Sequence, residues 1–181
     1  MPFRRLTNAL AGLALLTGGV AVAEPADPRA RVERLLSHHH ETPSKAALAT
    51  VPGVDKILRA IAGDDLRFPP RRYAAFDALQ HWPDARTRAL YTAAVAAGQP
   101  AGLRHRVLRL WPRAFGVGAL PVLRAALTDP DPQIRLTAAV AVDELSGGAA
   151  SKALADALAA EPNAMVRAEL GRLVARRAEL R

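Results

Sequence analysis

The chain has 181 residues, enough for one domain with a substantial hydrophobic core. Half of the residues are hydrophobic but only 4% are aromatic, and the formal net charge is +8. Alanine and leucine dominate the apolar content, and both lose little side-chain entropy in a helix, so the composition favours helices over strands. The absence of cysteine excludes disulfides, thiolate metal sites and cysteine nucleophiles.

The first 23 residues have the organisation of a secretory signal peptide. Arg4 and Arg5 lie near the start, residues 6–20 are largely apolar, and Ala21-Val22-Ala23 offers the small residues that a signal peptidase reads. We therefore predict cleavage after Ala23 and a periplasmic or secreted mature chain, with an uncleaved membrane anchor as the alternative. Loss of the two arginines would leave a net charge of +6. No later segment is long and apolar enough to cross a bilayer, so we expect no membrane span after cleavage.

Apolar periodicity and capping residues predict helices along the rest of the chain. We expect a helix over residues 28–39 with Asp27 as its N-cap, and a short one over 45–50. Four helix pairs should follow, at 52–62 with 70–80, 84–97 with 101–113, 119–127 with 132–145, and 150–160 with 164–179. Trp82-Pro83 and Trp111-Pro112 are each expected to end the second helix of a pair, with the tryptophan used for packing. Asp131 and Pro132 suit the N-cap and the first turn of a helix.

A repeat of about 32 residues runs through these pairs. Arg72, Arg104, Arg135 and Arg167 lie near the start of successive second helices, at intervals of 32, 31 and 32 residues. The positions three and seven residues after each arginine are all apolar and fall on one helical face, which predicts that they are buried. These positions are Ala75, Leu79, Val107, Trp111, Ala138, Val142, Leu170 and Val174.

Residues 129–142, with the sequence DPDPQIRLTAAVAV, closely resemble the bacterial HEAT repeat, including the HEAT-like repeats named after phycobilisome lyases. Residues 161–167 are similar. The resemblance is strongest over 118–181 and fades toward residue 52. It implies an all-α protein, an α-solenoid of about four helix pairs. We expect residues 24–51 to form an N-terminal helical cap and residues 52–181 to form the HEAT-like repeat domain.

The resemblance also implies a structural role for the repeated arginines. In such repeats this arginine holds neighbouring repeats together by pairing with acids in the turns, and the candidate acids here are Asp65, Asp129, Asp131 and Glu161. The unit at Arg104 is expected to lack a partner, because its own turn reads Gly98-Gln99-Pro100.

The sequence contains no nucleophile-elbow, phosphate-loop or zinc-protease motif, so we expect neither an enzyme nor a bound cofactor. His38, His39, His40 and Glu41 form the one cluster with metal-ligand chemistry. Adjacent helical residues point about 100° apart, so only His38 and Glu41 would share a face unless the segment unwinds. His38, His40 and Glu41 are therefore candidate ligands, and the other interpretation is a solvated helix end.

The charge is distributed unevenly, and this is the most informative functional feature. No Asp or Glu occurs in the 44 residues between Asp84 and Asp129, which contain seven arginines and no lysine. Arginine makes forked hydrogen bonds to carboxylates and phosphates, so this stretch is a candidate docking surface, although an ordinary solvated face would have the same composition. Spacing places Arg106, Arg109 and Arg113 in one row. The seven candidates are Arg86, Arg88, Arg104, Arg106, Arg109, Arg113 and Arg124.

Three functions are compatible with these patterns. The first is a non-catalytic scaffold or adaptor outside the cytoplasm, which binds a protein or an anionic envelope component such as a lipid headgroup. The second is a nucleic-acid-binding HEAT-like protein, although the signal peptide and the scarcity of aromatic residues argue against nucleic acid. The third is a cofactor-attachment lyase or chaperone, which rests on the resemblance alone.

Overall fold

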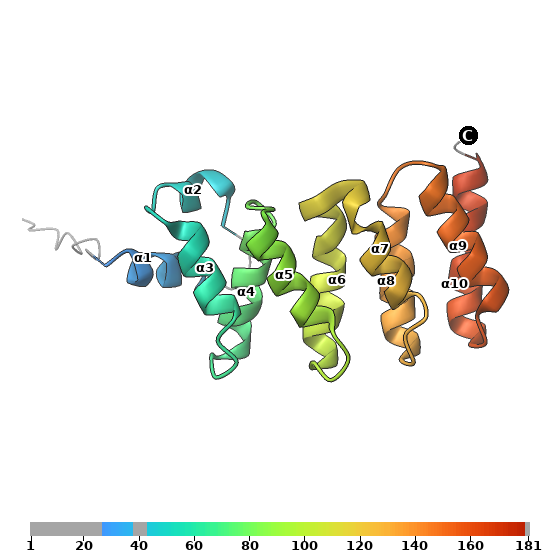
Figure 1. Ribbon diagram of the computed structural model, residues 1–181, viewed down its shortest axis with the longest axis horizontal. Coiled ribbons are helices and arrows are strands. Elements are labelled where there is room, and N and C mark those ends of the chain that lie inside the picture. Colours follow the sequence, from blue (N-terminus) through green and yellow to red (C-terminus); the bar gives the residue numbers. More distant parts are fainter. Residues whose placement is uncertain (1–26, 38–42, 180–181) are drawn as a thin grey trace, which may run out of the picture.

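The computed structural model describes residues 27–37 and 43–179, and every regular element in these ranges is a helix (Figure 1). The predicted signal peptide and residues 38–42 lie outside the described residues. The elements are α1 (Pro28–Leu35), α2 (Lys45–Ala49), α3 (Val54–Ala62), α4 (Pro69–Leu79), α5 (Ala85–Val95), α6 (Ala101–Phe115), the 3-10 helix η1 (Gly116–Ala119), α7 (Leu120–Ala126), α8 (Pro132–Asp143), α9 (Gly148–Ala160) and α10 (Ala164–Glu179).

Helices α3 to α10 form four successive pairs that lie side by side in chain order (Figure 1). The first helices of the pairs, α3, α5, α7 and α9, form the nearer layer in Figure 1, which we call the first-helix layer. The second helices, α4, α6, α8 and α10, form the second-helix layer, in which each helix contacts the next. The turns within the pairs all lie along the lower edge, which we call the turn edge. Helix α1 packs against α3 at the N-terminal end.

The predicted helix starts are confirmed where a capping side chain defines them. The Asp27 carboxylate accepts backbone N–H groups of Arg29 and Ala30 at the start of α1, and Asp131 accepts the N–H of Gln133 at 2.8 Å at the start of α8. The ends are less accurate, because α8 stops at Asp143 and not at residue 145.

The prediction that Trp111-Pro112 ends a helix is wrong. Helix α6 continues through Pro112 to Phe115 and ends at Gly116, whose φ of 51° favours glycine. Proline removes one backbone hydrogen bond, but the extra turn places Phe115 against the Trp111 ring, with 4.9 Å between ring centroids. This aromatic packing stabilises the continuation.

The core lies between the two layers and contains the predicted apolar positions. Seven of the eight repeat positions are buried, and Val174 is partly buried against the same core. Trp111 is fully buried and packs edge-on to Tyr91, which confirms its packing role, and partly buried Trp82 also packs against the core. The Tyr91 hydroxyl donates to the backbone oxygen of Phe76 at 2.7 Å, which links α5 to α4 inside the core.

Candidate functional site

The structure divides the seven candidate arginines between the two layers. Arg86 and Arg88 lie on α5 and Arg124 lies on α7, all in the first-helix layer. Arg104, Arg106, Arg109 and Arg113 lie on α6, in the second-helix layer. The seven residues therefore do not form one continuous surface.

Two of the three arginines in the first-helix layer connect neighbouring helix pairs. Arg88 donates to the backbone oxygen of Gly118 at 3.3 Å and lies over the Phe115 ring, 4.1 Å from its centroid. Arg124 donates to the backbone oxygen of Ala149 in the next pair at 3.2 Å. Arg86 is exposed and has no partner within the part of the chain that the structure describes.

Arg104 has an acidic partner, contrary to the expectation from its own turn. Its guanidinium forms an ion pair with Asp129, which lies in the turn of the following helix pair, and both side chains are only about a tenth exposed. Its Nε also donates to the backbone oxygen of Val95 at 3.1 Å. The expectation was wrong because it considered only the turn that precedes Arg104. The side chain also reaches the turn of the next helix pair along the edge.

The same arrangement recurs at Arg135 and gives a chain of contacts along the turn edge. Arg135 donates to both carboxylate oxygens of Glu161 in the next turn, at 2.6 and 2.8 Å, and to the backbone oxygen of Asp129 in its own turn at 2.8 Å. Arg167 then donates to the backbone oxygen of Glu161 at 2.8 Å. We call the residues Arg104, Asp129, Arg135, Glu161 and Arg167 the turn-edge ladder.

Arg72, at the other end of the series, follows only part of this pattern. It donates to the backbone oxygen of Ala62 at 2.8 Å and pairs with Asp65 of its own turn at 2.5 Å. The next turn contains Gly98 and Gln99 and no acid. Asp65, Asp129 and Glu161 do pair with repeated arginines, but only Asp65 pairs with the arginine of its own turn, whereas Asp129 and Glu161 pair with the arginine of the preceding helix pair and Asp131 serves as a helix cap.

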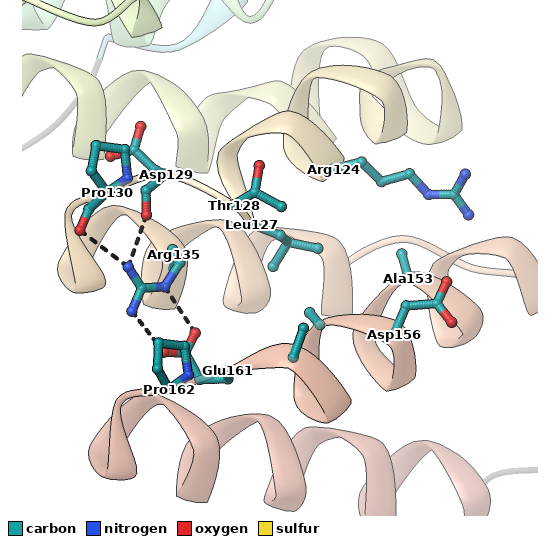
Figure 2. Close-up of a pocket in the computed structure, with 12 residues that line it drawn as sticks. Arg124, Leu127, Thr128, Asp129, Pro130, Arg135, Ala153, Asp156, Glu161 and Pro162 are labelled. Carbon is teal, nitrogen blue, oxygen red and sulfur yellow. Dashed lines mark hydrogen bonds and ion pairs between the residues drawn. The ribbon is translucent and has the colours of Figure 1, made fainter.

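Asp129, Arg135 and Glu161 of the turn-edge ladder line one end of an open cavity of about 590 Å³ between α7 and α9 (Figure 2). Figure 2 shows Arg135 directed at Glu161 and at the Asp129 segment, while Arg124 points away at the opposite end. Leu127 and alanines of α9, including Ala153, line the cavity. The hydrogen bond from Arg135 lowers the pKa of Glu161, although burial acts in the opposite direction. The polar groups of Asp129, Arg135 and Glu161 at this end of the cavity are therefore hydrogen-bonded to one another.

The row Arg106, Arg109 and Arg113 does share one face of α6, as its spacing predicts, and lines a groove of about 370 Å³. The groove lies along α6 and includes Asp77 and Gln80 from the α4 side. We call these three arginines the basic row. All three are exposed on the second-helix layer.

The members of the basic row differ in their partners. Arg106 binds the Asp77 carboxylate with two N–H groups, and this hydrogen bonding raises the pKa of Arg106. Arg113 lies 3.7 Å from Glu144 of α8. Arg109, between them, has no partner among the described residues. Within the described part of the chain, the groove therefore presents one guanidinium without a partner, flanked by Arg106, which Asp77 binds, and by Arg113, which has only the longer contact with Glu144.

Sequence reasoning missed the carboxylates of this site. Asp77 is 7% exposed and was not assigned to any role, because its repeat equivalents are Arg109, Val140 and Arg172 and no periodic signal marks it. Asp143 of α8 is a second such carboxylate, since Arg176 and Arg177 of α10 both pair with it.

The candidate metal ligands His38, His40 and Glu41 lie outside the described residues. Within residues 27–37 and 43–179, no group of three or more histidine and acidic side chains is arranged to hold a metal ion. None of the helices in these ranges combines the length and apolar character that a bilayer crossing requires.

Comparison with known proteins adds no assignment. No protein-family model matches the sequence, and a search of curated proteins finds no match.

Proposed function

We propose that this chain is an exported, non-catalytic α-solenoid of HEAT-like repeats that binds an anionic partner through its basic row. The support for the architecture is the 32-residue period together with helix pairs that stack in chain order. Stacked pairs present long surfaces that suit extended partners. The signal-like residues 1–23 support export to the periplasm or the medium.

The observation that carries the binding proposal is the position of Arg109. Its exposed guanidinium lines a groove between Arg106, which Asp77 binds, and Arg113, which lies 3.7 Å from Glu144, and it has no partner among the described residues. Arginine binds carboxylates and phosphates with forked hydrogen bonds, so an anionic group of a partner fits this position. Arg86, Arg88, Arg104 and Arg124 are not part of the proposed surface, because they lie in the other layer or within the turn-edge ladder.

In-cell crosslinking followed by mass spectrometry tests this proposal. Full-length wild type should capture a discrete partner that Arg109→Glu loses. Arg86→Glu is the matched control, because Arg86 is also exposed and without a partner in the described part of the chain but belongs to the first-helix layer. Equal capture by wild type and Arg109→Glu would reject the basic row as the binding surface.

Export has its own test. Fractionation of the native host should place the chain outside the cytoplasm, and N-terminal sequencing of that material should begin at Glu24. A cytoplasmic chain that retains Met1 would reject export and would revive the nucleic-acid-binding alternative. Binding to duplex DNA that weakens steeply with added salt would then support that alternative.

A further inference from the structure

Four ion pairs of the second-helix layer share an asymmetry in which the arginine is the more exposed partner, whereas Arg177, which also pairs with Asp143, is itself only 13% exposed. The carboxylate is most recessed in the pairs at Asp77 and Asp143. The Arg106 side chain is 46% exposed while that of Asp77 is 10% exposed, and the corresponding values for Arg176 and Asp143 are 59% and 10%. The pairs with this asymmetry are Arg106–Asp77, Arg113–Glu144, Arg172–Glu169 and Arg176–Asp143.

Among the other described ion pairs of arginine, this asymmetry recurs around Glu33, which is 22% exposed beneath Arg29 and Arg71 at 46% and 44%. In the turn-edge ladder both partners are recessed, as in Arg135–Glu161, where the side chains are 12% and 2% exposed. Arg59 and Arg72 are recessed and their partners Asp84 and Asp65 are the exposed groups. Exposed arginine over a more recessed acid is therefore concentrated on the surface of α6, α8 and α10, with a second occurrence at Glu33 near the N-terminal end.

These pairs connect successive helices and so extend the basic row across the layer. Arg106 joins α6 to α4, Arg113 joins α6 to α8, and Arg176 joins α10 to α8. Arg172 pairs with Glu169 within α10, one turn before Arg176. We call Arg106, Arg109, Arg113, Arg172 and Arg176 the arginine band. Its arginines lie on α6 and α10, and α8 lies between these two helices and contacts both.

The recessed carboxylates prepare the band for an acceptor on a partner. A guanidinium has five N–H donors, and Arg106 uses its Nε and one terminal nitrogen on Asp77. The remaining donors stay available at an exposed position. Because the carboxylate already fixes the side chain, less rotamer entropy is lost when a partner binds.

The same carboxylates restrict the kind of anion that fits. The five arginines of the band lie among Asp77, Asp143, Glu144 and Glu169, and Arg177 also pairs with Asp143, so these ten groups together carry a net charge of only +2. Nucleic acids and anionic membranes are attracted mainly by net charge and by counterion release, which a nearly neutral surface supplies poorly. Single carboxylates can instead use the directed short-range hydrogen bonds of each guanidinium.

We infer that the partner is an acidic polypeptide segment that lies across α6, α8 and α10 and places successive carboxylates on the arginine band. This inference rests on the proposed function and names the class of partner that the same surface takes. Packed helices have axes about 8–10 Å apart, so α6 and α10, with α8 between them, are about 16–20 Å apart. A polyproline II segment repeats its facing side chain every three residues, at about 9.3 Å, so acids at every third position include pairs about 18.6 Å apart, which match the spacing of α6 and α10.

Fluorescence anisotropy with defined probes tests the inference on the full chain. The first probe is a fluorescein-labelled peptide of four Glu-Pro-Pro units, and the second has the same composition with its four glutamates adjacent. We expect the spaced peptide to bind about tenfold more tightly, since the loss of one charge-assisted contact weakens binding by about that factor. A 12-base-pair DNA duplex and vesicles with an anionic phospholipid should each bind more weakly than the spaced peptide.

Two variants locate the peptide on the surface. Arg109→Glu on α6 and Arg172→Glu on α10 should each weaken binding of the spaced peptide about tenfold. Neither residue bridges two helices, so both variants should remain folded, which an unchanged urea midpoint verifies. Arg86→Glu should leave the affinity within about twofold of wild type.

Several results would overturn the inference. Equal affinity for the two peptides would remove the spacing argument, and tighter binding of DNA or vesicles would replace the acidic polypeptide with a phosphate-bearing partner. Unchanged affinity in Arg172→Glu would confine binding to α6. Suppose that Arg172→Glu also captures the wild-type partner in cells and that Arg109→Glu does not. The inference then fails and the proposed function stands. If Arg109→Glu captures the same partner as wild type, the proposed function fails as well.

Discussion

The turn-edge ladder and the arginine band use the same side chains in different surroundings. The ladder pairs Arg104 and Arg135 with carboxylates of the next turn and recesses both partners, whereas in the band's pairs at Asp77 and Asp143 the acid is recessed and the arginine of the band is exposed. Removing one member of a buried pair leaves an uncompensated charge, whereas an exposed arginine can be replaced at little cost in stability. The comparison teaches that burial of the guanidinium, and not its pairing, separates arginines that hold the repeats together from arginines available to a partner.

Arg135→Ala should give the largest loss of stability. The Glu161 side chain is 2% exposed and would lose its two hydrogen bonds from Arg135, so we expect unfolding free energy to fall by about 3–5 kcal/mol. Urea denaturation of the variant and the wild type measures the difference. A change below about 1 kcal/mol would show that the ladder is no more important to folding than an exposed pair.

Arg106→Ala should lower the free energy of unfolding by an intermediate amount. Its size tests the boundary between the ladder and the band. The Asp77 side chain, 10% exposed beside Arg106, would lose its partner, but solvent can reach the site that the exposed Arg106 leaves, so we expect a loss of about 1–2 kcal/mol. The same urea experiment measures it. A loss as large as that of Arg135→Ala would place Arg106 among the structural arginines and remove it from the arginine band.

Acidification should weaken the ladder selectively. The hydrogen bond from Arg135 lowers the pKa of Glu161 from its ordinary value of 4.5, so the ion pair stabilises the fold fully above that value and loses its contribution as the pH falls through the lowered pKa. Urea midpoints recorded between pH 7 and pH 2 should therefore converge for wild type and Arg135→Ala at the acidic end. A constant difference between the two proteins across this range would contradict the assignment.

Arg109→Ala should change the free energy of unfolding least among these variants. Arg109 is exposed and has no partner among the described residues, so we expect the free energy of unfolding to change by less than about 0.5 kcal/mol. Thermal and urea unfolding of the variant check this. A clear destabilisation would indicate a structural contact of Arg109 and would weaken the case for a binding role.

Most of the helical organisation could be predicted from the sequence, because it depends on local signals. Asp27 and Asp131 cap helices as expected, and the final helix has the predicted bounds, Ala164–Glu179. The end of α6 was wrong because the packing of Trp111 and Phe115 outweighs the local effect of Pro112. Tertiary packing of this kind has no signature in the spacing of residues.

The candidate site was predicted only in part, because its pairing partners are distant in the sequence. Helical spacing correctly placed Arg106, Arg109 and Arg113 on one face. The partners Asp77 and Asp129 lie 29 and 25 residues from Arg106 and Arg104, respectively, and neither pair is implied by a motif. Sequence alone therefore grouped seven arginines by composition, whereas the structure distinguishes those in the ladder from those in the band.

The most direct test of the division between structural and binding arginines is in-cell crosslinking capture by Arg109→Glu, read together with the urea midpoint of the same protein. We predict that the midpoint stays at the wild-type value while the partner is lost, because Arg109 contributes to the surface and not to the fold. A variant that keeps both its midpoint and its partner would contradict the account, since the unpaired arginine of the basic row would then contribute neither to folding nor to binding.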